Sequence, residues 1–184
     1  TTAIATLAKL LSWNGIDVIA AAPPQSPLSQ MLAGDEAIHI ITAATLEDSI
    51  LRQAAEPFGG RRYAVLIDDA DRITVQPTKQ GFNDAPTLLE EIARPAQLGH
   101  HALILAADAT PILSGQRRSL AKVTNEILMS GTRILLTPAK RGEARQLNIA
   151  LEPDQYFTRP PGRGYLATTG AATLIQLATV GGSS

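Results

Sequence analysis

The sequence predicts an α/β fold in which helices cover both faces of a mostly parallel β-sheet, giving three layers. Two patterns lead to this prediction. Short apolar runs alternate with stretches whose apolar residues recur at helical spacing, and one run, Tyr63–Ile67, has no polar interruption. Such a continuous run is typical of a parallel strand that is buried on both faces. A chain of 184 residues suits one core, and we see no repeat or convincing boundary, so we expect residues 1–184 to form a single domain.

The helices follow the apolar spacing and end at residues that break it. The first is expected over Thr1–Trp13, because Asn14 and Gly15 tolerate the left-handed backbone that ends helices. A helix over Thr45–Pro57 would be capped by Thr45, with Asp48 three residues later. The expected helices are Thr1–Trp13, Ser26–Ala33, Thr45–Pro57, Ala85–Ala96 and Ser119–Met129.

The strands are the apolar runs between these helices. The expected strands of the alternating part are Ile16–Ala22, Ala37–Ile41, Tyr63–Ile67, His101–Ala106 and Thr132–Leu136. The polar segment Thr74–Asn83 is expected to be a loop. Two last β-rich runs, Gly164–Thr168 and Ala172–Ala178, flank Thr169-Gly170, which indicates an antiparallel hairpin at the edge of the sheet.

Composition excludes or disfavours several classes of function. Cysteine is absent, which excludes disulfides, thiolate zinc sites and cysteine nucleophiles. The formal charge is −1 and the basic residues are scattered, so we do not expect nucleic acid as a partner. No apolar run approaches the roughly 20 residues of a membrane-spanning helix, and no signal peptide opens the chain. We therefore expect residues 1–184 to be soluble.

An acidic pair follows the strongest strand. In open α/β sheets, ligands bind beyond the carboxyl ends of the strands. Asp68 and Asp69 come directly after Tyr63–Ile67, as in a Walker B motif. There, Asp68 would hold Mg²⁺ through water, and Asp69 would orient or deprotonate the attacking water as a catalytic residue. The alternative is that both residues cap a turn together with Asp71.

The amino terminus has the pattern that follows a phosphate-binding loop. A Walker A motif, G-x-x-x-x-G-K-[ST], ends in the first turn of a helix. Thr1 and Thr2 open a helix here, so Thr1 would ligate Mg²⁺ and Thr2 would be the next helical residue. The glycines and lysine of the motif do not occur in these residues, and we expect that loop upstream of residue 1. The alternative is an ordinary threonine N-cap.

Two further segments bear on a bound nucleotide. Gly162 and Gly164 permit close backbone approach to a ligand, and Arg163 could reach a base or a phosphate. The alternative is a tight surface connection. Asp108 follows the strand that begins at His101, where a polar sensor of the γ-phosphate is common; an aspartate repels that phosphate, which indicates a degenerate site.

Taken in order, these segments resemble one family. Tyr-Ala-Val-Leu-Ile-Asp-Asp-Ala-Asp (63–71), Leu-Gly-His-His-Ala-Leu-Ile-Leu-Ala (98–106) and Pro-Pro-Gly-Arg-Gly-Tyr-Leu (160–166) resemble the FtsK/SpoIIIE-type ATPase domains. More narrowly, they are similar to the last ATPase domain of the EccC motors of type VII secretion systems. The resemblance spans nearly the whole chain.

The resemblance implies a RecA-like P-loop fold with ATP and Mg²⁺ as cofactors. It places Thr1, Thr2, Asp68 and Asp69 at the Walker motifs and Arg163 with its glycines beside the nucleotide base. It also implies the soluble part of a membrane-anchored complex on the cytoplasmic side of the cell membrane. The implied partners are other ATPase domains of the same motor, further copies in a hexamer, and small helical substrates with a carboxy-terminal export signal.

Two departures from an active motor predict weak or conditional hydrolysis. Aspartate stands at position 69, where glutamate is more common, and aspartate also stands at position 108. The leading hypothesis is therefore an ATP-binding module of a protein-secretion motor. A non-catalytic module that docks a partner on a degenerate P-loop fold is the first alternative. A DNA translocase domain is the second.

Overall fold

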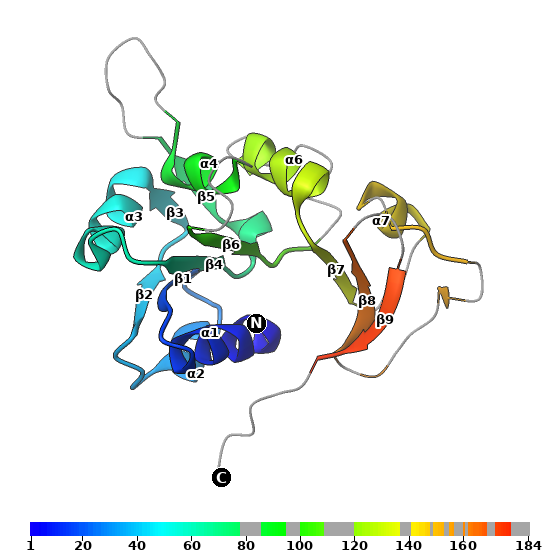
Figure 1. Cartoon of the computed structure of the whole chain (residues 1–184), viewed down its shortest axis with the longest axis horizontal. Helices are drawn as coiled ribbons and strands as arrows, with labels where there is room; N and C mark the ends of the chain where they lie inside the picture. Colours follow the sequence, from blue (N-terminus) through cyan, green and yellow to red (C-terminus); the bar gives the residue numbers. More distant parts are fainter. Residues whose placement is uncertain are drawn as a thin grey trace. The chain divides into compact units, whose positions relative to one another are not determined.

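The computed structural model describes residues 1–77, 86–94, 100–108, 120–136, 141–147, 149–152, 155–156, 160, 162–168 and 172–177. The chain divides into two compact units, Thr1–Val123 and Thr124–Ser184 (Figure 1). The expectation that residues 1–184 form a single domain stays a prediction.

The first unit is built on a four-stranded sheet in the order β2-β1-β4-β6, and all its neighbouring strands are parallel. The strands are β1 (Asp17–Ala22), β2 (Ile38–Thr42), β4 (Tyr63–Ile67) and β6 (Ala102–Leu105). All five residues of β4 are buried, and β4 lies between β1 and β6, as its uninterrupted apolar run predicts. The predicted α/β fold with a mostly parallel sheet is confirmed.

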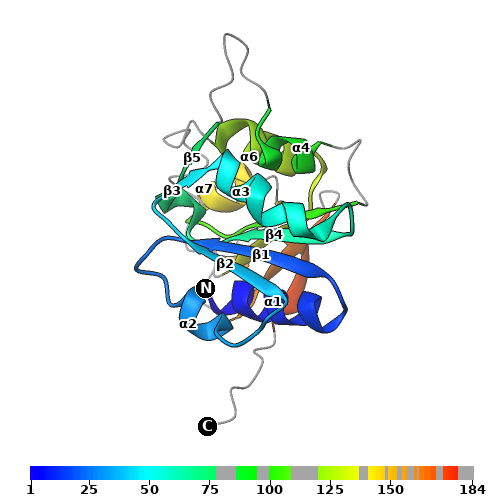
Figure 2. The same ribbon diagram turned by 90° about the vertical axis from the view of Figure 1, so that its left-hand side faces the viewer.

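Helices cover both faces of this sheet. The helices α1 (Thr2–Trp13) and α2 (Leu28–Leu32) lie on one face, and α3 (Asp48–Ala55) and α4 (Leu88–Ala93) lie on the other (Figures 1 and 2). A capping box begins α4, because Thr87 and Glu90 exchange side-chain to backbone hydrogen bonds. The helix α6 (Ala121–Ser130) crosses from the first unit into the second.

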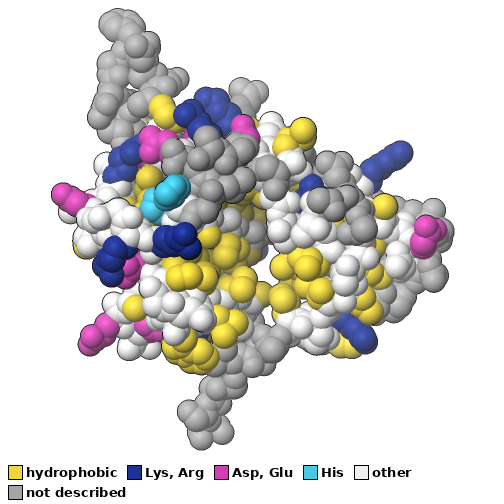
Figure 3. Space-filling view, in the orientation of Figure 1, with side chains coloured by type: hydrophobic (Ala, Val, Ile, Leu, Met, Phe, Trp, Pro, Cys, Tyr) yellow, Lys and Arg dark blue, Asp and Glu magenta, His cyan; other side chains and the backbone are white. Residues whose placement is uncertain are grey.

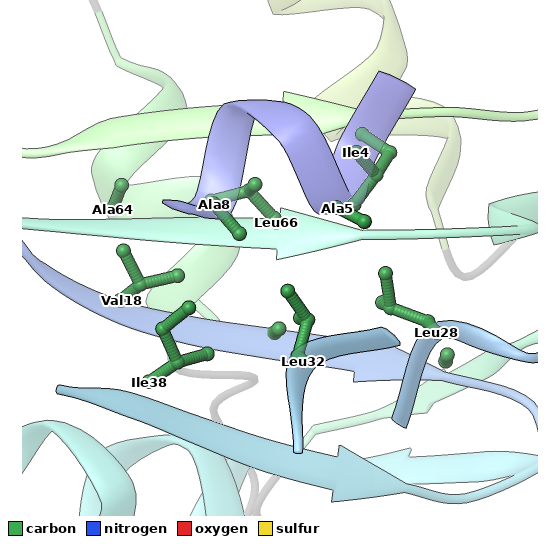
Figure 4. Close-up of a cluster of buried hydrophobic side chains, with 11 residues drawn as sticks. Ile4, Ala5, Ala8, Val18, Leu28, Leu32, Ile38, Ala64 and Leu66 are labelled. Atoms are coloured by element: carbon green, nitrogen blue, oxygen red, sulfur yellow. The ribbon is translucent and has the colours of Figure 1, made fainter. Parts of the chain in front are cut away.

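The core under α1 and α2 consists of small and branched apolar side chains. Val18 on β1 and Leu66 on β4 point to this face (Figure 4). Ala20 belongs to the same core, because alternate residues of a strand share one side. Leu28 and Leu32 of α2 are fully buried against them. This packing fixes α1 and α2 above the sheet and so sets the position of both helix amino termini.

Two predictions about local structure are wrong. The helix expected from Thr45 begins at Asp48, and Thr45–Glu47 is a strand, β3, that pairs in parallel with β5 (Thr74–Gln76). The segment that we expected to be a loop from Thr74 thus opens with a strand, and residues 78–85 lie outside the described part. Burial of Leu46 and Val75 explains the pairing, since each points inward between two outward neighbours. Glu47, and not Thr45, is at the N-cap.

The described part of the first unit also contains two short 3-10 helices, η1 (Glu56–Phe58) and η2 (Ala70–Arg72). They follow α3 and β4, respectively.

The second unit contains an antiparallel sheet in the order β7-β8-β9. The predicted hairpin is present as β8 (Arg163–Ala167) and β9 (Ala172–Gln176). Its expected place at the edge of the parallel sheet is wrong, because β8 pairs with β7 and β9 in this separate sheet. The strand β7 (Arg133–Leu136) pairs antiparallel with β8. A helix that we did not predict, α7 (Arg141–Gln146), places Ala144 in the same core as Leu135 and Tyr165.

Candidate functional site

Asp68 is a buried carboxylate at the carboxyl end of β4. Its backbone amide donates to the Ala21 carbonyl at 2.9 Å, which extends the ladder between β4 and β1 by one residue. The residue is 1% exposed. Because a buried carboxylate is costly without hydrogen-bond donors, its partners identify the groups that this site is built to hold together.

Thr1 supplies the first donor. Its hydroxyl donates to Asp68 Oδ2 at 2.6 Å, and its backbone nitrogen lies 3.2 Å from Asp68 Oδ1. Thr1 is at the N-cap of α1, but its side chain makes no capping hydrogen bond. The hydroxyl is therefore directed at the carboxylate, and capping does not account for it. The structure brings Thr1 and Asp68 together, while their role toward Mg²⁺ stays a prediction.

Ser26 supplies the second donor, and our sequence analysis missed it. Its hydroxyl donates to the same oxygen, Asp68 Oδ2, at 2.9 Å and accepts from the Leu28 amide at 3.2 Å. The side chain is buried, with 7% exposure. Ser26 lies in the turn after β1, and β1 is the parallel neighbour of β4. Ser26 was expected to begin a helix, but α2 begins at Leu28, so a search for hydroxyls would have had to include the first residue of each helix that follows a strand.

Asp69 adopts the left-handed backbone conformation, with φ of +48°, and it is half-buried. Within the described ranges it is the one non-glycine residue with positive φ. Its carbonyl accepts from the Arg72 amide at 2.8 Å, which begins η2. Its side chain does not cap η2. Asp69 thus stands at a sharp turn directly after the buried carboxylate, and its predicted role in hydrolysis stays a prediction.

The turn after β4 is linked to the end of β6. The Ala70 amide donates to the Ala106 carbonyl at 2.9 Å, and Asp71 Oδ1 accepts from the Asp108 amide at 3.0 Å. Asp71 therefore joins this turn to the segment after β6, whereas Asp68 is bound to hydroxyls from two other segments. Asp108 is exposed at the same edge of the sheet.

The remaining predicted site residues have ordinary structural surroundings. Thr2 is the exposed first residue of α1. Gly162 has φ of +78°, and the Arg163 amide donates to the Pro160 carbonyl at 3.1 Å, which makes a tight turn before β8. Gly164 is buried where a Cβ would meet the backbone of β7. These last three residues belong to the second unit, and their predicted contact with a nucleotide stays a prediction.

The oxygen atoms around Asp68 fit a magnesium site in which the protein supplies only one or two of the ligands. Mg²⁺ prefers oxygen ligands and is usually held by one or two carboxylates, with water and substrate phosphates completing the shell. Asp68 offers a carboxylate and Thr1 offers a hydroxyl beside it. Within the described residues, no group of three or more His, Cys, Asp or Glu side chains could hold a metal ion alone. Thr1 and Asp68 could hold Mg²⁺ together with water or phosphate ligands.

Charged side chains of both signs are interspersed on the face shown in Figure 3. Ion pairs join Arg52 to Glu91 at 2.9 Å and Arg61 to Asp17 at 3.1 Å. That nucleic acid is not a partner stays a prediction.

The parallel sheet carries a threonine hydroxyl and a buried aspartate at its carboxyl edge, and its fold is similar to that of two solved ATPase structures. The cytoplasmic domain of the type VII secretion ATPase EccC from Thermomonospora curvata is similar, with a TM-score of 0.61 and 16% identity; the match covers 98% of this chain and 23% of that chain. A structure described as an ATPase is similar with a TM-score of 0.54 and 14% identity, covering 89% of this chain and 63% of that chain.

These comparisons confirm the predicted resemblance at the level of the fold. No family description matches the chain, and no curated protein matches it by sequence. The chain spans less than a quarter of the EccC chain that it matches. In the part of the chain that the structure describes, no helix has the length and apolar character needed to cross a membrane.

Proposed function

We propose that this chain is an ATP-binding domain of a secretion motor of the EccC type, with weak or conditional ATP hydrolysis. The contact between Thr1 and Asp68 carries the proposal, because it unites a helix amino terminus with the end of the neighbouring buried strand. An anion at a helix amino terminus is favoured by the helix dipole and by free amides, so a phosphate is the natural ligand there.

Within this proposal, each residue has a definite task. Thr1 and Asp68 would hold Mg²⁺, which when bound neutralises phosphate charge during phosphoryl transfer. Asp69 would orient or deprotonate water, and its side chain is one methylene shorter than the glutamate that is common there. Asp108 would disfavour the γ-phosphate by charge repulsion. Weak hydrolysis with retained binding follows from this combination.

The partners and the location follow from the similarity to EccC and are proposals of the same kind. We expect this domain to act beside other ATPase domains in a hexamer, on the cytoplasmic side of the cell membrane. We expect its protein substrates to be small and helical, with a carboxy-terminal export signal. The description of the similar structure as the cytoplasmic domain of a secretion ATPase supports this placement.

Nucleotide binding by the full protein, as its gene encodes it, tests the proposal. A fluorescent ATP analogue is titrated with and without Mg²⁺ against the wild type, Asp68→Ala and the control Ser29→Ala. Ser29 lies on α2 near the site and has no hydrogen bond to Asp68. We expect Asp68→Ala to lose about tenfold or more in Mg²⁺-dependent affinity, as for a group around a metal, and Ser29→Ala to lose none.

Two other outcomes would favour the alternatives. If the wild type binds no nucleotide, the proposal fails and a module that docks a partner becomes the better explanation. Retention of the protein on DNA that falls steeply with salt would instead support a translocase.

A further inference from the structure

We propose that Ser26 is a positioning residue that holds the Asp68 carboxylate in the orientation needed for a cation. This inference rests on the proposed function, and it assigns a role to a residue that lies in neither Walker motif. The observation that carries it is the pair of hydrogen bonds made by one buried hydroxyl.

The two hydroxyls on Asp68 Oδ2 differ in what remains free on their oxygen atoms. Ser26 Oγ accepts from the Leu28 amide at 3.2 Å while it donates to Asp68. A hydroxyl has one proton and two lone pairs, so this amide fixes the direction of the Ser26 proton. For Thr1 Oγ1, the structure gives a donated bond only. Thr1 therefore keeps both lone pairs for a cation, whereas Ser26 already uses its proton and one lone pair within the protein.

Ser26 is also anchored more firmly than Thr1. Its side chain is 7% exposed, and its backbone amide donates to the Pro23 carbonyl at 2.9 Å, which closes the turn after β1. The Leu28 amide that it binds begins α2, and Leu28 is fully buried in the core. The backbone of Ser26 is thus held by the turn after β1, and its hydroxyl is held by the first amide of α2.

This anchoring matters because the hydrogen bond from Thr1 to Asp68 can change when the Thr1 oxygen binds a cation. A hydroxyl that binds a cation must turn its lone pair toward it, which constrains the direction of its proton. Ser26 keeps a second donor on Oδ2 whatever the Thr1 hydroxyl does, so the rotamer of Asp68 does not depend on Thr1 alone. Partners of this kind, which bind a metal-site residue and not the metal, commonly affect metal affinity by about 10- to 100-fold.

The test measures the concentration of Mg²⁺ that is required for nucleotide binding. Wild type, Ser26→Ala, Ser26→Thr and the control Ser29→Ala are titrated with Mg²⁺ at a fixed concentration of a fluorescent ATP analogue. We expect Ser26→Ala to need about tenfold more Mg²⁺ for half-maximal binding, because one donor to the carboxylate is lost. Binding without Mg²⁺ should not change. Ser26→Thr keeps the hydroxyl and should stay within about twofold of the wild type.

A second measurement does not involve nucleotide. The urea unfolding of Ser26→Ala, Asp68→Ala and the double variant forms a cycle that isolates the interaction of the two side chains. Coupling in this cycle, together with the altered Mg²⁺ requirement, supports the proposal. A Mg²⁺ requirement of Ser26→Ala equal to that of Ser29→Ala overturns it, and so does an absence of coupling. A wild type that binds no nucleotide overturns the proposed function, and the role toward a cation with it, even if the coupling is present.

Discussion

The Thr1 hydroxyl donates a hydrogen bond of 2.6 Å to Asp68 Oδ2, although the two residues are 67 positions apart in the chain. They meet because α1 packs on β1 and β4 with its amino terminus at the edge where β4 ends. A hydroxyl at a helix start and a carboxylate at a strand end thereby form one group of oxygen atoms. The following predictions concern the chemistry at this edge and the contacts that hold the rest of the fold.

Asp69 is predicted to be too short for efficient hydrolysis. In the full protein, Asp69→Ala should leave nucleotide affinity nearly intact, because this residue would face the attacking water and not the bound nucleotide. Its ATP turnover should fall by much less than the roughly hundredfold expected for a working general base. Asp69→Glu should raise turnover, since the added methylene moves the carboxylate toward the water. Steady-state ATP hydrolysis, measured beside nucleotide affinity, checks both expectations.

The φ of +48° at Asp69 sets the control for these variants. Aspartate adopts left-handed angles more readily than alanine or glutamate, so both variants carry some backbone strain. Unfolding by urea must therefore accompany the kinetics. A large loss of turnover in Asp69→Ala, with no gain in Asp69→Glu and little change in stability, would show that the native residue is a competent base.

Asp48 holds α3 to the start of α4. Its carboxylate is 2% exposed, accepts from the Leu88 amide at 2.6 Å and accepts from Arg52 Nε at 2.7 Å. Asp48→Ala should lower the free energy of unfolding by about 3–5 kcal/mol, because the buried amide loses its acceptor and the ion pair is broken. Urea unfolding followed by circular dichroism measures the change.

Glu91→Gln is the matched control for Asp48. Glu91 binds the same arginine but is more exposed, so its change should cost less than about 1 kcal/mol. Equal losses from the two variants would mean that the exposed carboxylate of Glu91 stabilises the fold as much as the buried carboxylate of Asp48.

Arg133 fastens the end of α6 to the antiparallel sheet of the second unit. Its side chain is 9% exposed; Nη1 donates to the Leu128 carbonyl at 2.6 Å and Nη2 donates to the Thr168 carbonyl at 3.2 Å. Arg133→Met keeps much of the apolar stem and removes both bonds. We expect a loss of about 1–3 kcal/mol in the free energy of unfolding. Arg145→Met, at an exposed position of α7, should change stability by less than about 0.5 kcal/mol. If both variants lose the same amount, the two carbonyl contacts contribute nothing.

Because of His101, the stability of the folded protein should fall in mild acid. Burial lowers the pKa of His101 below its ordinary value of about 6.5, and the neighbouring His100 lowers it further. Between the folded and the ordinary pKa, the unfolded chain binds more protons, so stability falls as the pH is lowered through this range. His101→Phe keeps a ring against Tyr63, which lies 4.0 Å from the His101 ring, and should reduce this pH dependence.

Thermal unfolding from pH 7.5 to 5 measures the effect of His101. His39→Gln removes a histidine from an exposed position on β2 and is the control. A His101→Phe protein whose stability keeps the full pH dependence of the wild type would contradict the prediction.

The strand order could only partly be predicted from local patterns. The uninterrupted run at Tyr63–Ile67 predicts a central strand, because only a strand covered on both faces can be apolar throughout. Thr45–Glu47 and Thr74–Gln76 have too few residues to show a period, so their pairing as β3 and β5 was not predicted. The two segments stabilise each other as strands only through a contact that is distant in sequence.

The candidate site, like the strand order, could be predicted only in part from the sequence. The sequence by itself determined that Asp68 ends a buried strand and that Thr1 begins an amphipathic helix, because hydrophobic periodicity and breaking residues are local properties of the chain. It also determined the antiparallel pairing of β8 with β9, whose short connection leaves few other arrangements. Only the tertiary structure decided that Ser26 joins Thr1 on Asp68. That contact depends on which strand lies beside β4, and the choice of β1 results from packing under α1 and α2.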